Sequence, residues 1–540
     1  MNIQTILSQT EGTAMLMNIV GNRNLRVALE QKAEAFPDKT FLIFEHPDER
    51  TSSYTFRQLD QMVNRTANAL LSMGVKKGDK VNLHLTNCPE FLFIWYAAAK
   101  IGAVMVPTNP LSPPDELSYP VQHSESVVSV TQPDLLPVVE AIRDSCPDIR
   151  QVVLCGVDDA PSGVVSFSEL VEGQPDELCK VPLEPEDEAA IMYTSGTTSR
   201  PKGVLVTHAN YVYAGEVVSK LMRLTPDDRQ LVTLPLYHAN AAYYSVTTAL
   251  IVGASVALMP RFSASRFMKQ AIRHECTVTS LFASPMRMIL AQPENPTDRE
   301  NQLRLVIFAQ NVTEAQLDEW HARFDAPLMQ IYGMTETMGQ PVTNPLDYTR
   351  NNMTMGMPTL GYECRIVDDE GSDVGVGVPG QLLVSGVPGR TIMKGYFKNP
   401  DATAEAIRDG WLWTGDIVEA DEQGYIRFVD RTKDMIKRAG ENVAAGEVEM
   451  VIKTHPGVAD AAVIGVPDPI RDETIKAFVI LKEGHRATEE DIVEFCESRL
   501  SKFRVPEFVE FRVDFPRTSV GKTQKHIMRQ EELAKHGGTK

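Results

Sequence analysis

Between two short apolar runs the chain reads Tyr193-Thr194-Ser195-Gly196-Thr197-Thr198-Ser199-Arg200-Pro201-Lys202-Gly203. The runs, 189–192 before it and 204–206 after it, are typical of buried strands because they are short, apolar and bounded by turn residues. The intervening loop holds five serine or threonine hydroxyls before Arg200, and its glycines let backbone amides turn toward an anion. This composition predicts a loop that binds a polyphosphate, with a plain polar hairpin as the alternative. Lys202 lies outside the G-x-x-x-x-G-K-[ST] spacing, so the loop is not a Walker A motif.

The composition restricts the class of protein. A chain of 540 residues is too long for a single hydrophobic core, so several domains are expected. Hydrophobic residues make up 43% and charged residues 23%, as in ordinary soluble globular proteins, and a net charge of −19 argues against non-specific nucleic-acid binding. Seven scattered cysteines without a C-x-x-C pair predict a reducing, cytoplasmic compartment, and no metal-site spacing occurs. We expect neither a signal peptide nor a membrane span.

Strand-like and helix-like segments alternate through much of the chain. Residues 81–85, 89–101 and 103–106 read strand, helix, strand. Similar alternation recurs up to residue 332, where the segments 305–309, 314–324 and 328–332 again read strand, helix, strand. The pattern predicts doubly wound α/β subdomains with ligands at the carboxyl ends of largely parallel strands. After residue 358, short alternating runs predict a small β-barrel-like subdomain. Within it, the G-x-G-x-x-G at 375–380 is interpreted as a turn, because a strand-like run follows it instead of a helix.

Four further motifs follow the loop. They are Tyr332-Gly333-Met334-Thr335-Glu336-Thr337, Thr414-Gly415-Asp416, the segment 430–437 and the segment 516–522, which ends in Gly-Lys. In this order, and over nearly the whole chain, they resemble the adenylate-forming superfamily of acyl-CoA synthetases, firefly luciferase and peptide-synthetase adenylation domains. Segments 87–91 and 470–479 are most similar to bacterial crotonobetaine/carnitine–CoA ligases. The resemblance implies an AMP- and acyl-binding domain over 1–430, a hinge over 431–433 and a small mobile α+β domain over 434–540.

The resemblance also implies a site for ATP and Mg²⁺. The phosphates would be held by Thr194, Ser195, Gly196, Thr197, Thr198 and Lys202. Glu336 would bind Mg²⁺, Thr335 would contact the α-phosphate, and Lys522 would reach the reacting carboxylate. Asp416 would accept hydrogen bonds from the ribose hydroxyls, with Arg431 beside the same ribose. The remaining nucleotide contacts are expected from Ala309, Gln310, Asn311, Tyr332, Gly333 and Met334.

A second set of residues is implied for coenzyme A and for the acid. Rotation about Lys433 would withdraw Lys522 and bring in a face that carries Lys437, Gly440, Glu441 and Asn442. The acyl pocket is expected from Tyr237, Tyr243, Tyr244, Ser284 and the segment 334–340, which includes Gly339. His238 would act as a gate between the acyl and thiol sites, and a structural histidine with satisfied hydrogen bonds is the alternative.

These features predict an ATP-dependent acid–thiol ligase that forms an acyl-adenylate, transfers the acyl group to coenzyme A, and releases AMP and pyrophosphate. The resemblance to crotonobetaine/carnitine–CoA ligases implies a small onium acid like carnitine or crotonobetaine, whose quaternary ammonium group aromatic faces could hold. Other short-chain, sulfonium-bearing or aromatic acids are alternatives. So are a carrier-protein-loading adenylation enzyme and a catalytically inactive nucleotide-binding protein. The oligomeric state is left open, with a homodimer among the alternatives.

Overall fold

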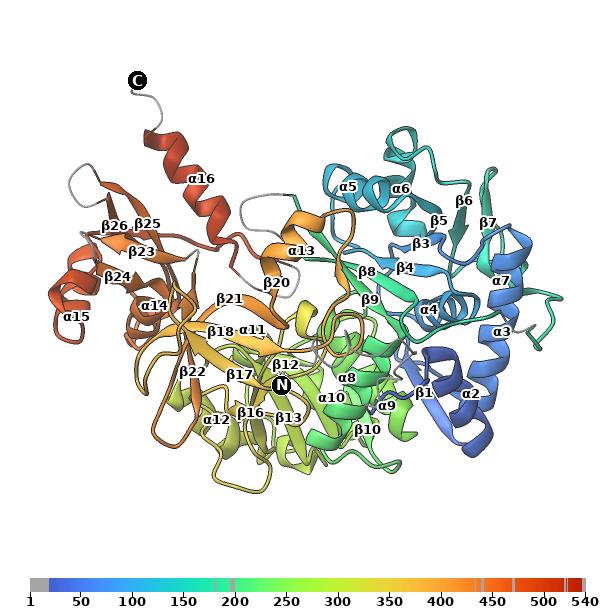
Figure 1. The fold of residues 1–540 in the computed structure, drawn as a ribbon. Helices are drawn as coiled ribbons and strands as arrows, with labels where there is room; N and C mark the ends of the chain where they lie inside the picture. The colour runs from blue at the N-terminus through green and yellow to red at the C-terminus, as the bar shows by residue number, and fades with distance from the viewer. Residues whose placement is uncertain are drawn as a thin grey trace, which may run out of the picture.

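The computed structural model describes residues 19–178, 181–194, 200–432, 434–438, 441–468, 472–518, 521 and 523–536, with only the backbone for 441, 442 and 536. Strands in these ranges form four sheets, and the α-helices lie mainly around the two largest (Figure 1). The elements from β23 onward, orange to red in Figure 1, gather at one end of the molecule. The predicted fold class, α/β with a small C-terminal α+β unit, is confirmed.

The first large sheet has nine strands in the order β16-β15-β14-β13-β12-β10-β11-β1-β2. Its central pairs are parallel, and the pairs at both edges are antiparallel. The carboxyl ends of β12, β13 and β14 therefore meet at one edge, as the strand–helix alternation predicts. The strands are β1 (Thr40–Glu45), β2 (Thr51–Thr55), β10 (Arg229–Val232), β11 (Ser255–Leu258), β12 (Val278–Phe282), β13 (Leu305–Ala309), β14 (Leu328–Tyr332), β15 (Val342–Thr343) and β16 (Met357–Pro358).

The second large sheet has eight strands in the order β19-β9-β8-β4-β3-β5-β6-β7. They are β3 (Lys80–Leu83), β4 (Val104–Pro107), β5 (Ser126–Thr131), β6 (Gln151–Leu154), β7 (Val164–Ser166), β8 (Glu188–Thr194), β9 (Lys202–Thr207) and β19 (Gly395–Tyr396). β8 runs parallel to β4 but antiparallel to β9, with Thr194 opposite Lys202. The predicted phosphate loop thus connects two strands of a hairpin. A hairpin was the alternative to a phosphate-binding loop, and the two strands do form one. A hairpin can also carry a phosphate-binding loop, so this topology does not decide between the two functions.

Several helices around the two large sheets begin at residues that local sequence signals mark. α3, α8 and α12 each start with a capping box formed by Thr55, Thr207 or Thr313, which satisfies amides of the first turn. The helices are α2 (Leu25–Ala35), α3 (Phe56–Ser72), α4 (Pro89–Ile101), α5 (Pro114–Ser124), α6 (Leu136–Ala141), α7 (Phe167–Val171), α8 (His208–Leu221), α9 (Thr248–Val252), α10 (Phe267–Arg273), α11 (Ala283–Leu290) and α12 (Glu314–Phe324). Short 3₁₀ segments are η1 (Pro133–Leu135), η2 (Arg143–Ser145), η4 (Asp298–Glu300) and η5 (Thr335–Thr337), while η3 (Asn240–Thr247) is a π-helix.

The small antiparallel sheet contains β17 (Cys364–Val367), β18 (Gly380–Ser385), β20 (Ile407–Arg408), β21 (Trp411–Ala420) and β22 (Ile426–Arg431), with α13 (Pro400–Ala406) beside it. It corresponds to the predicted barrel-like subdomain. The interpretation of 375–380 as a turn is confirmed, because these residues lead directly into β18.

The C-terminal sheet has the order β24-β23-β26-β25, with β27 on β26. Its elements are β23 (Met435–Arg438), β24 (Glu441–Ala444), α14 (Ala445–Lys453), β25 (Val458–Asp468), β26 (Asp472–Leu481), α15 (Glu489–Glu497), η6 (Lys502–Arg504), β27 (Phe508–Phe511) and α16 (Lys525–His536). Two apolar clusters, which together run from Ile436 to Met528, lie within this unit. These residues form a core separate from the main one.

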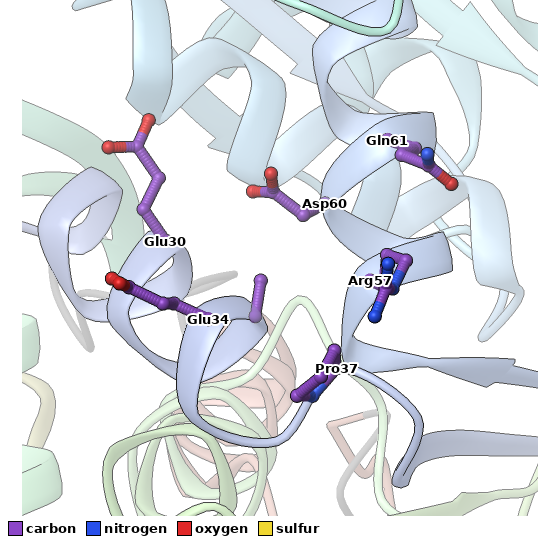
Figure 2. Close-up of a pocket in the computed structure, with 7 residues that line it drawn as sticks. Glu30, Glu34, Pro37, Arg57, Asp60 and Gln61 are labelled. Atoms are coloured by element: carbon purple, nitrogen blue, oxygen red, sulfur yellow. The ribbon is translucent and has the colours of Figure 1, made fainter.

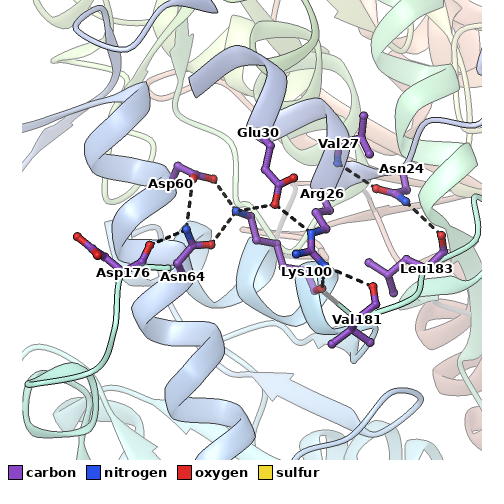
Figure 3. Close-up of polar contacts among 10 residues, drawn as sticks. All are labelled: Asn24, Arg26, Val27, Glu30, Asp60, Asn64, Lys100, Asp176, Val181 and Leu183. Carbon is purple, nitrogen blue, oxygen red and sulfur yellow. Dashed lines mark hydrogen bonds and ion pairs between the residues drawn. The ribbon is translucent and has the colours of Figure 1, made fainter. Parts of the chain in front are cut away.

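A buried ion network joins α2, α3 and α4 far from the motifs (Figure 3). The Lys100 ammonium, only 1% exposed, lies 2.6 Å from Asp60 Oδ1, 2.8 Å from Asn64 Oδ1 and 3.4 Å from Glu30 Oε1. Glu30 also accepts a hydrogen bond from Arg26 at 2.9 Å. The Lys100 ammonium is paired with carboxylates and hydrogen-bonded to an amide, and a charged group can be buried only when it has such partners.

A cavity of about 390 Å³ opens between α2 and α3, lined by Glu30, Ala33, Glu34, Pro37, Arg57, Asp60 and Gln61 (Figure 2). Two of its carboxylates, Glu30 and Asp60, already pair with Lys100. Its lining contains none of the motif residues, so we do not assign it to the candidate site.

Two expectations from composition concern cysteines and membranes. The six cysteines in the described ranges are free. None of the helices there combines the length and apolar character that crossing a bilayer requires.

Candidate active site

Three polar side chains from distant parts of the chain meet beyond the carboxyl end of β14. Tyr332, the last residue of β14, donates its hydroxyl to Asp416 Oδ2 at 2.6 Å. Arg431 Nε lies 3.2 Å from Asp416 Oδ1, and the two residues face each other across β21 and β22. The Asp416 carboxylate raises the pKa of the Arg431 guanidinium, which stays charged. Asp416 is thus a buried acceptor held in one orientation, and each of its oxygens keeps a lone pair for a ligand.

Glu336 occupies the same region, on η5. Its side chain is buried and accepts a hydrogen bond from the Tyr396 hydroxyl at 3.0 Å. Burial raises the pKa of Glu336, and the nearby Asp416 adds to this effect, whereas the Tyr396 hydrogen bond and Arg431 oppose it. A carboxylate in this setting would be stabilised by an added cation.

Lys202 approaches Glu336 through a tyrosine. Its ammonium lies 4.8 Å from the centre of the Tyr396 ring, and Tyr396 is the residue whose hydroxyl bonds Glu336. Tyr396 reaches this place because β19 pairs with β9, with Tyr396 opposite Val204. The end of the predicted phosphate loop and the Glu336 motif are therefore joined through one aromatic ring.

Two residues in the candidate site adopt a backbone conformation that L-amino acids rarely take. Gln310, directly after β13, has φ of +78°, and Met338, directly after η5, has φ of +63°. Such conformations persist only where surrounding structure enforces them, and they concentrate at functional sites. Both lie on loops that follow neighbouring parallel strands, so the expected nucleotide residues Ala309, Gln310 and Asn311 and the segment from Tyr332 to Thr335 share one edge of the sheet.

Two glycines allow tyrosines to pack directly on the backbone of this turn. A Cβ at Gly333 would come within 2.3 Å of the Tyr244 hydroxyl, and one at Gly339 within 2.4 Å of the Tyr362 hydroxyl. Tyr244 donates to the Gly339 carbonyl at 3.1 Å, and Tyr362 accepts from the Gly339 amide at 2.8 Å. Only glycine permits such close approach, so the tyrosines fix the shape of the turn.

The expected acyl-pocket residues come from two segments that meet near the end of β12. The His238 ring packs edge-on against Phe282, the last residue of β12, with 5.3 Å between ring centres. Ser284 follows on α11. Tyr244 lies on η3 and contacts Gly339 as described, whereas Tyr243 is fully buried with its hydroxyl 3.0 Å from Met192 Sδ. Tyr237 is half-buried. His238 Nδ1 accepts from the Asn240 amide at 3.2 Å, as a structural histidine would, and this contact does not decide its role.

The C-terminal unit lies against this same edge. A Cβ at Gly521 would come within 2.8 Å of the Ser284 hydroxyl, so Gly521 touches α11. Arg517 in this segment pairs with Asp460 at 2.6 Å. Asp460 is largely buried, and Lys453, Arg517 and Arg287 of α11 outweigh this burial and lower its pKa to about 2. α11 thus carries both an expected acyl-pocket residue and a seat for the C-terminal unit.

A second contact between the units lies beside the predicted hinge. Asp430, on β22, accepts a hydrogen bond from the amide of Gly446 in the first turn of α14 at 3.1 Å. Lys525 Nζ lies 2.7 Å from Glu449 on the same helix. Burial alone would lower the pKa of Lys525, but Glu449, Asp430 and Asp434 outweigh it and the pKa is raised. Burial raises the pKa of Asp430, while Lys525 opposes the shift.

Several expected residues fall outside the described residues: Ser195, Gly196, Thr197, Thr198, Lys433, Gly440 and Lys522, together with the side chains of Glu441 and Asn442. Of the others, Thr194 ends β8, its hydroxyl 3.4 Å from the Lys202 carbonyl. Thr335 and Met334 are half-buried at the start of η5. Lys437 is exposed on β23, with its amide bonded to Glu473 at 2.8 Å.

The residues present fit the expected magnesium ion because Glu336 offers it one buried carboxylate. Within the described ranges, no group of three or more His, Cys, Asp or Glu side chains could hold a metal by itself. Mg²⁺ is commonly held by one or two carboxylates together with substrate phosphates, and the buried Glu336 oxygen donor suits that arrangement. Glu336 would be its protein ligand, and the ion would neutralise phosphate charge when bound.

Sequence reasoning missed Tyr396 and Tyr362, and also the Asp460 and Asp430 contacts. Tyr396 lies in a short Gly-Tyr strand whose pairing with β9 spans almost two hundred residues, and its sequence carries no local signal. Asp430 lies within the 430–437 motif, one residue before Arg431, and this position was the available signal.

Comparison with known proteins gives consistent matches. Residues 29–397 match the family model described as AMP-binding enzyme, and residues 447–522 match the AMP-binding enzyme C-terminal domain. The crotonobetaine/carnitine–CoA ligases of Escherichia coli and Salmonella agona are 40% identical over 510 and 513 residues, which is 94% of this chain and 99% of each relative.

Solved structures are similar over the same span. The anthranilate CoA ligase AuaEII in complex with anthranoyl-AMP superposes with a TM-score of 0.88 at 28% identity, covering 96% of this chain and 98% of that one. ATP-bound MatB from Rhodopseudomonas palustris gives a TM-score of 0.85 at 28% identity, covering 94% and 99% of the two chains.

Proposed function

The chain belongs to the AMP-binding enzyme family, as an AMP-forming acyl-CoA ligase, and from this premise we propose that its acid is a short carboxylate bearing a quaternary ammonium group. In the proposed reaction a carboxylate oxygen attacks the α-phosphorus of ATP, the bond to the bridging oxygen breaks, and pyrophosphate leaves. The sulfur of coenzyme A then attacks the acyl carbon, the bond to AMP breaks, and the thiol proton passes to solvent.

The observation that supports this chemistry best is the convergence of Asp416, Arg431, Tyr332 and Glu336 at one edge of the sheet. Both reactants are anions, so the protein has to orient them and balance their charge. In our proposal Asp416 holds the ribose, Glu336 holds Mg²⁺, and Lys202 and Lys522 supply positive charge.

The proposal for the acid rests on the relatives named above and on the tyrosines around the expected pocket. Tyr244 presents an aromatic ring beside Gly333 and Gly339, and aromatic faces attract quaternary ammonium groups. The described residues within the expected pocket include no carboxylate besides Glu336, so cation–π attraction is the contact we propose for the onium group.

Carboxylate-dependent ATP–pyrophosphate exchange across a panel of acids tests the proposed substrate. We expect exchange to be fastest with carnitine and crotonobetaine, slower with a sulfonium analogue and with butanoate, and slowest with benzoate and anthranilate. Faster exchange with an aromatic or a plain aliphatic acid would reject the onium proposal and keep the ligase. Absence of exchange with every acid, with normal ATP binding, would favour an inactive nucleotide-binding protein. Competition between coenzyme A and a carrier protein as acceptor would reveal a carrier-loading enzyme.

Asp416→Asn tests the proposed ribose contact. An amide loses the charge and one acceptor oxygen, so we expect the KM for ATP to rise by about tenfold or more. The wild type should also discriminate against 2′-deoxy-ATP, and the variant should discriminate much less, because the lost hydroxyl no longer has its partner. Asp373→Asn, which removes an exposed ion pair with Arg365 in the same sheet, is the control and should leave both values unchanged. Undiminished discrimination in Asp416→Asn would contradict the assignment.

A further inference from the structure

Gln340 is, among the buried carboxamides of the described ranges, the one whose nitrogen and oxygen both lack a hydrogen-bond partner. Its side chain is completely buried. Asn240, Gln230 and Gln270 each leave only their oxygen unpaired. A buried amide without partners destabilises the protein that carries it, so such a group calls for an explanation. A ligand that is absent from the free enzyme is one explanation, and a trapped water is another.

The backbone of Gln340 is fixed beside the candidate site. Its carbonyl accepts a hydrogen bond from the Thr359 hydroxyl at 2.5 Å. It directly follows Gly339, whose amide and carbonyl are bonded to Tyr362 and Tyr244. A Cβ at Gly333 would lie 2.9 Å from the Gly339 carbonyl, so the residues just before Gln340 touch the residue just after Tyr332. Gln340 therefore directly follows a fixed turn, and that turn packs against the motif that carries Glu336.

A second buried amide with an unpaired atom lies on the helix whose Tyr244 contacts this turn. Asn240 begins the π-helix η3, is 3% exposed, and has an Oδ1 without a partner. Hydrogen bonds in a π-helix span five residues, so Asn240 and Tyr244, four apart, lie near one another on the helix surface. Tyr244 is the residue that contacts Gly339. Two segments that meet at Gly339 thus each bring an unsatisfied amide, and π-helical turns are frequent at functional sites.

We propose that Gln340 is a specificity-determining residue that hydrogen-bonds a hydroxyl group on the acyl chain of the substrate. A hydroxyl is both donor and acceptor and so matches an amide with both atoms free, whereas a hydrocarbon chain leaves the amide unpaired. The inference rests on the proposed function and deepens it. Of the two acids in the relatives' name, it favours carnitine, which carries a hydroxyl on its third carbon, over the unsaturated crotonobetaine.

Gln340→Met removes both polar atoms and keeps a side chain of similar length. The assay is acid-dependent pyrophosphate exchange with carnitine and with 4-trimethylammoniobutanoate, which has the same skeleton without the hydroxyl. We expect kcat/KM for carnitine to fall by about tenfold or more, which corresponds to about 1.4 kcal/mol, while the value for the acid without the hydroxyl changes little. An equal fall for both acids, or no fall for carnitine, overturns the inference.

The thermal midpoint of the free enzyme separates a ligand contact from a structural one. If the amide is unpaired without substrate, Gln340→Met should leave the midpoint unchanged or raise it, because an unsatisfied group is removed. A lowered midpoint would mean that a buried water or other partner holds the amide in the free enzyme, and would overturn the inference.

Gln230→Met is the matched control. Gln230 is also fully buried with an unpaired Oε1. It lies near the amino end of β10, whereas the candidate site lies at the carboxyl ends of the neighbouring parallel strands. It should not alter the discrimination between the two acids. An equal change in Gln230→Met would indicate general loosening of the core and overturn the inference.

Failure of the proposed function can be distinguished from failure of this inference. Exchange with both onium acids but no effect of Gln340→Met on hydroxyl discrimination keeps the function and rejects the inference. If the wild type accepts neither onium acid, the same comparison is made with 3-hydroxybutanoate and butanoate, where loss of hydroxyl preference in Gln340→Met supports the inference. Acceptance of neither hydroxylated acid rejects it.

Discussion

Lys522→Ala is expected to lower carboxylate-dependent ATP–pyrophosphate exchange by about 10²–10³-fold and to leave thioester formation from a supplied acyl-adenylate largely unchanged. The reason is that the proposed role of Lys522 is confined to the first half-reaction, in which charge develops between two anions. Removing a group that stabilises charge only in that transition state lowers its rate and spares the step in which the group is absent.

The arrangement of the C-terminal unit supports this expectation. Gly521, the residue before Lys522, lies against Ser284 on α11, and Arg517 is anchored to the buried Asp460. Lys437, on the face proposed for the second half-reaction, is exposed on β23. The unit is therefore seated with Gly521 toward the candidate site.

The opposite pattern is expected for Gly440→Leu, in which adenylation should continue and thioester formation should fall. Lys535→Ala, which removes a half-exposed lysine of α16, is the control and should alter neither step. Measuring exchange and single-turnover thioester formation in all three variants tests whether Lys522 and Gly440 act in different half-reactions. If both half-reactions fell equally in Lys522→Ala and in Gly440→Leu, the proposal of two alternating faces would be wrong.

Lys100→Met is expected to destabilise the large N-terminal part by about 1–3 kcal/mol. The substitution keeps the length of the side chain but removes the buried ammonium that pairs with Asp60 and Glu30, which are 20% and 34% exposed. Asp60 and Glu30 keep some contact with solvent, so the expected cost is that of losing hydrogen bonds to a charged group, which exceeds the cost of losing an ordinary hydrogen bond. Calorimetry should show a lower thermal midpoint for the main transition.

Lys77→Met provides the control for this prediction. Its ammonium lies 2.6 Å from Asp187, the same distance as that between Lys100 and Asp60, but Lys77 is 44% exposed whereas Lys100 is 1% exposed. Exposed ion pairs contribute less than about 1 kcal/mol, so Lys77→Met should shift the midpoint little. Adding Asp60→Asn to Lys100→Met should recover part of the loss. Equal effects of the two lysine substitutions would contradict the argument from burial.

The regular elements of the fold could be predicted because their signals are local. The segment 89–101 is apolar, begins at a proline and ends before a glycine, and α4 has the same bounds. β13, α12 and β14 likewise follow the predicted segments 305–309, 314–324 and 328–332. Each of these elements carries its own periodicity and caps.

The contacts of the site could be predicted only where a motif marked them. The resemblance implied that Asp416 and Arg431 lie beside the same ribose, and the structure brings the two together and adds the Tyr332 hydroxyl as a third member. It gave no sign of Tyr396, because the strand that holds it is two residues long and pairs with a distant segment. Nor did it separate Tyr243 from Tyr244, since the π-helix that turns the first toward Met192 and the second toward Gly339 has no recognisable sequence period.

The placement of α11 links the shape of the proposed acyl pocket to the surface that contacts the C-terminal unit. The segment from Phe282 to Arg287 packs on His238 through its first residue, meets Gly521 through Ser284, and faces Asp460 through Arg287. A redesign that widens the proposed pocket by changing this segment would also reshape the surface on which the smaller lobe rests. Evolution of a new acid preference in this enzyme should therefore proceed through η3 and the residues after Gly339, where a side chain can change without altering the surface that contacts the smaller lobe.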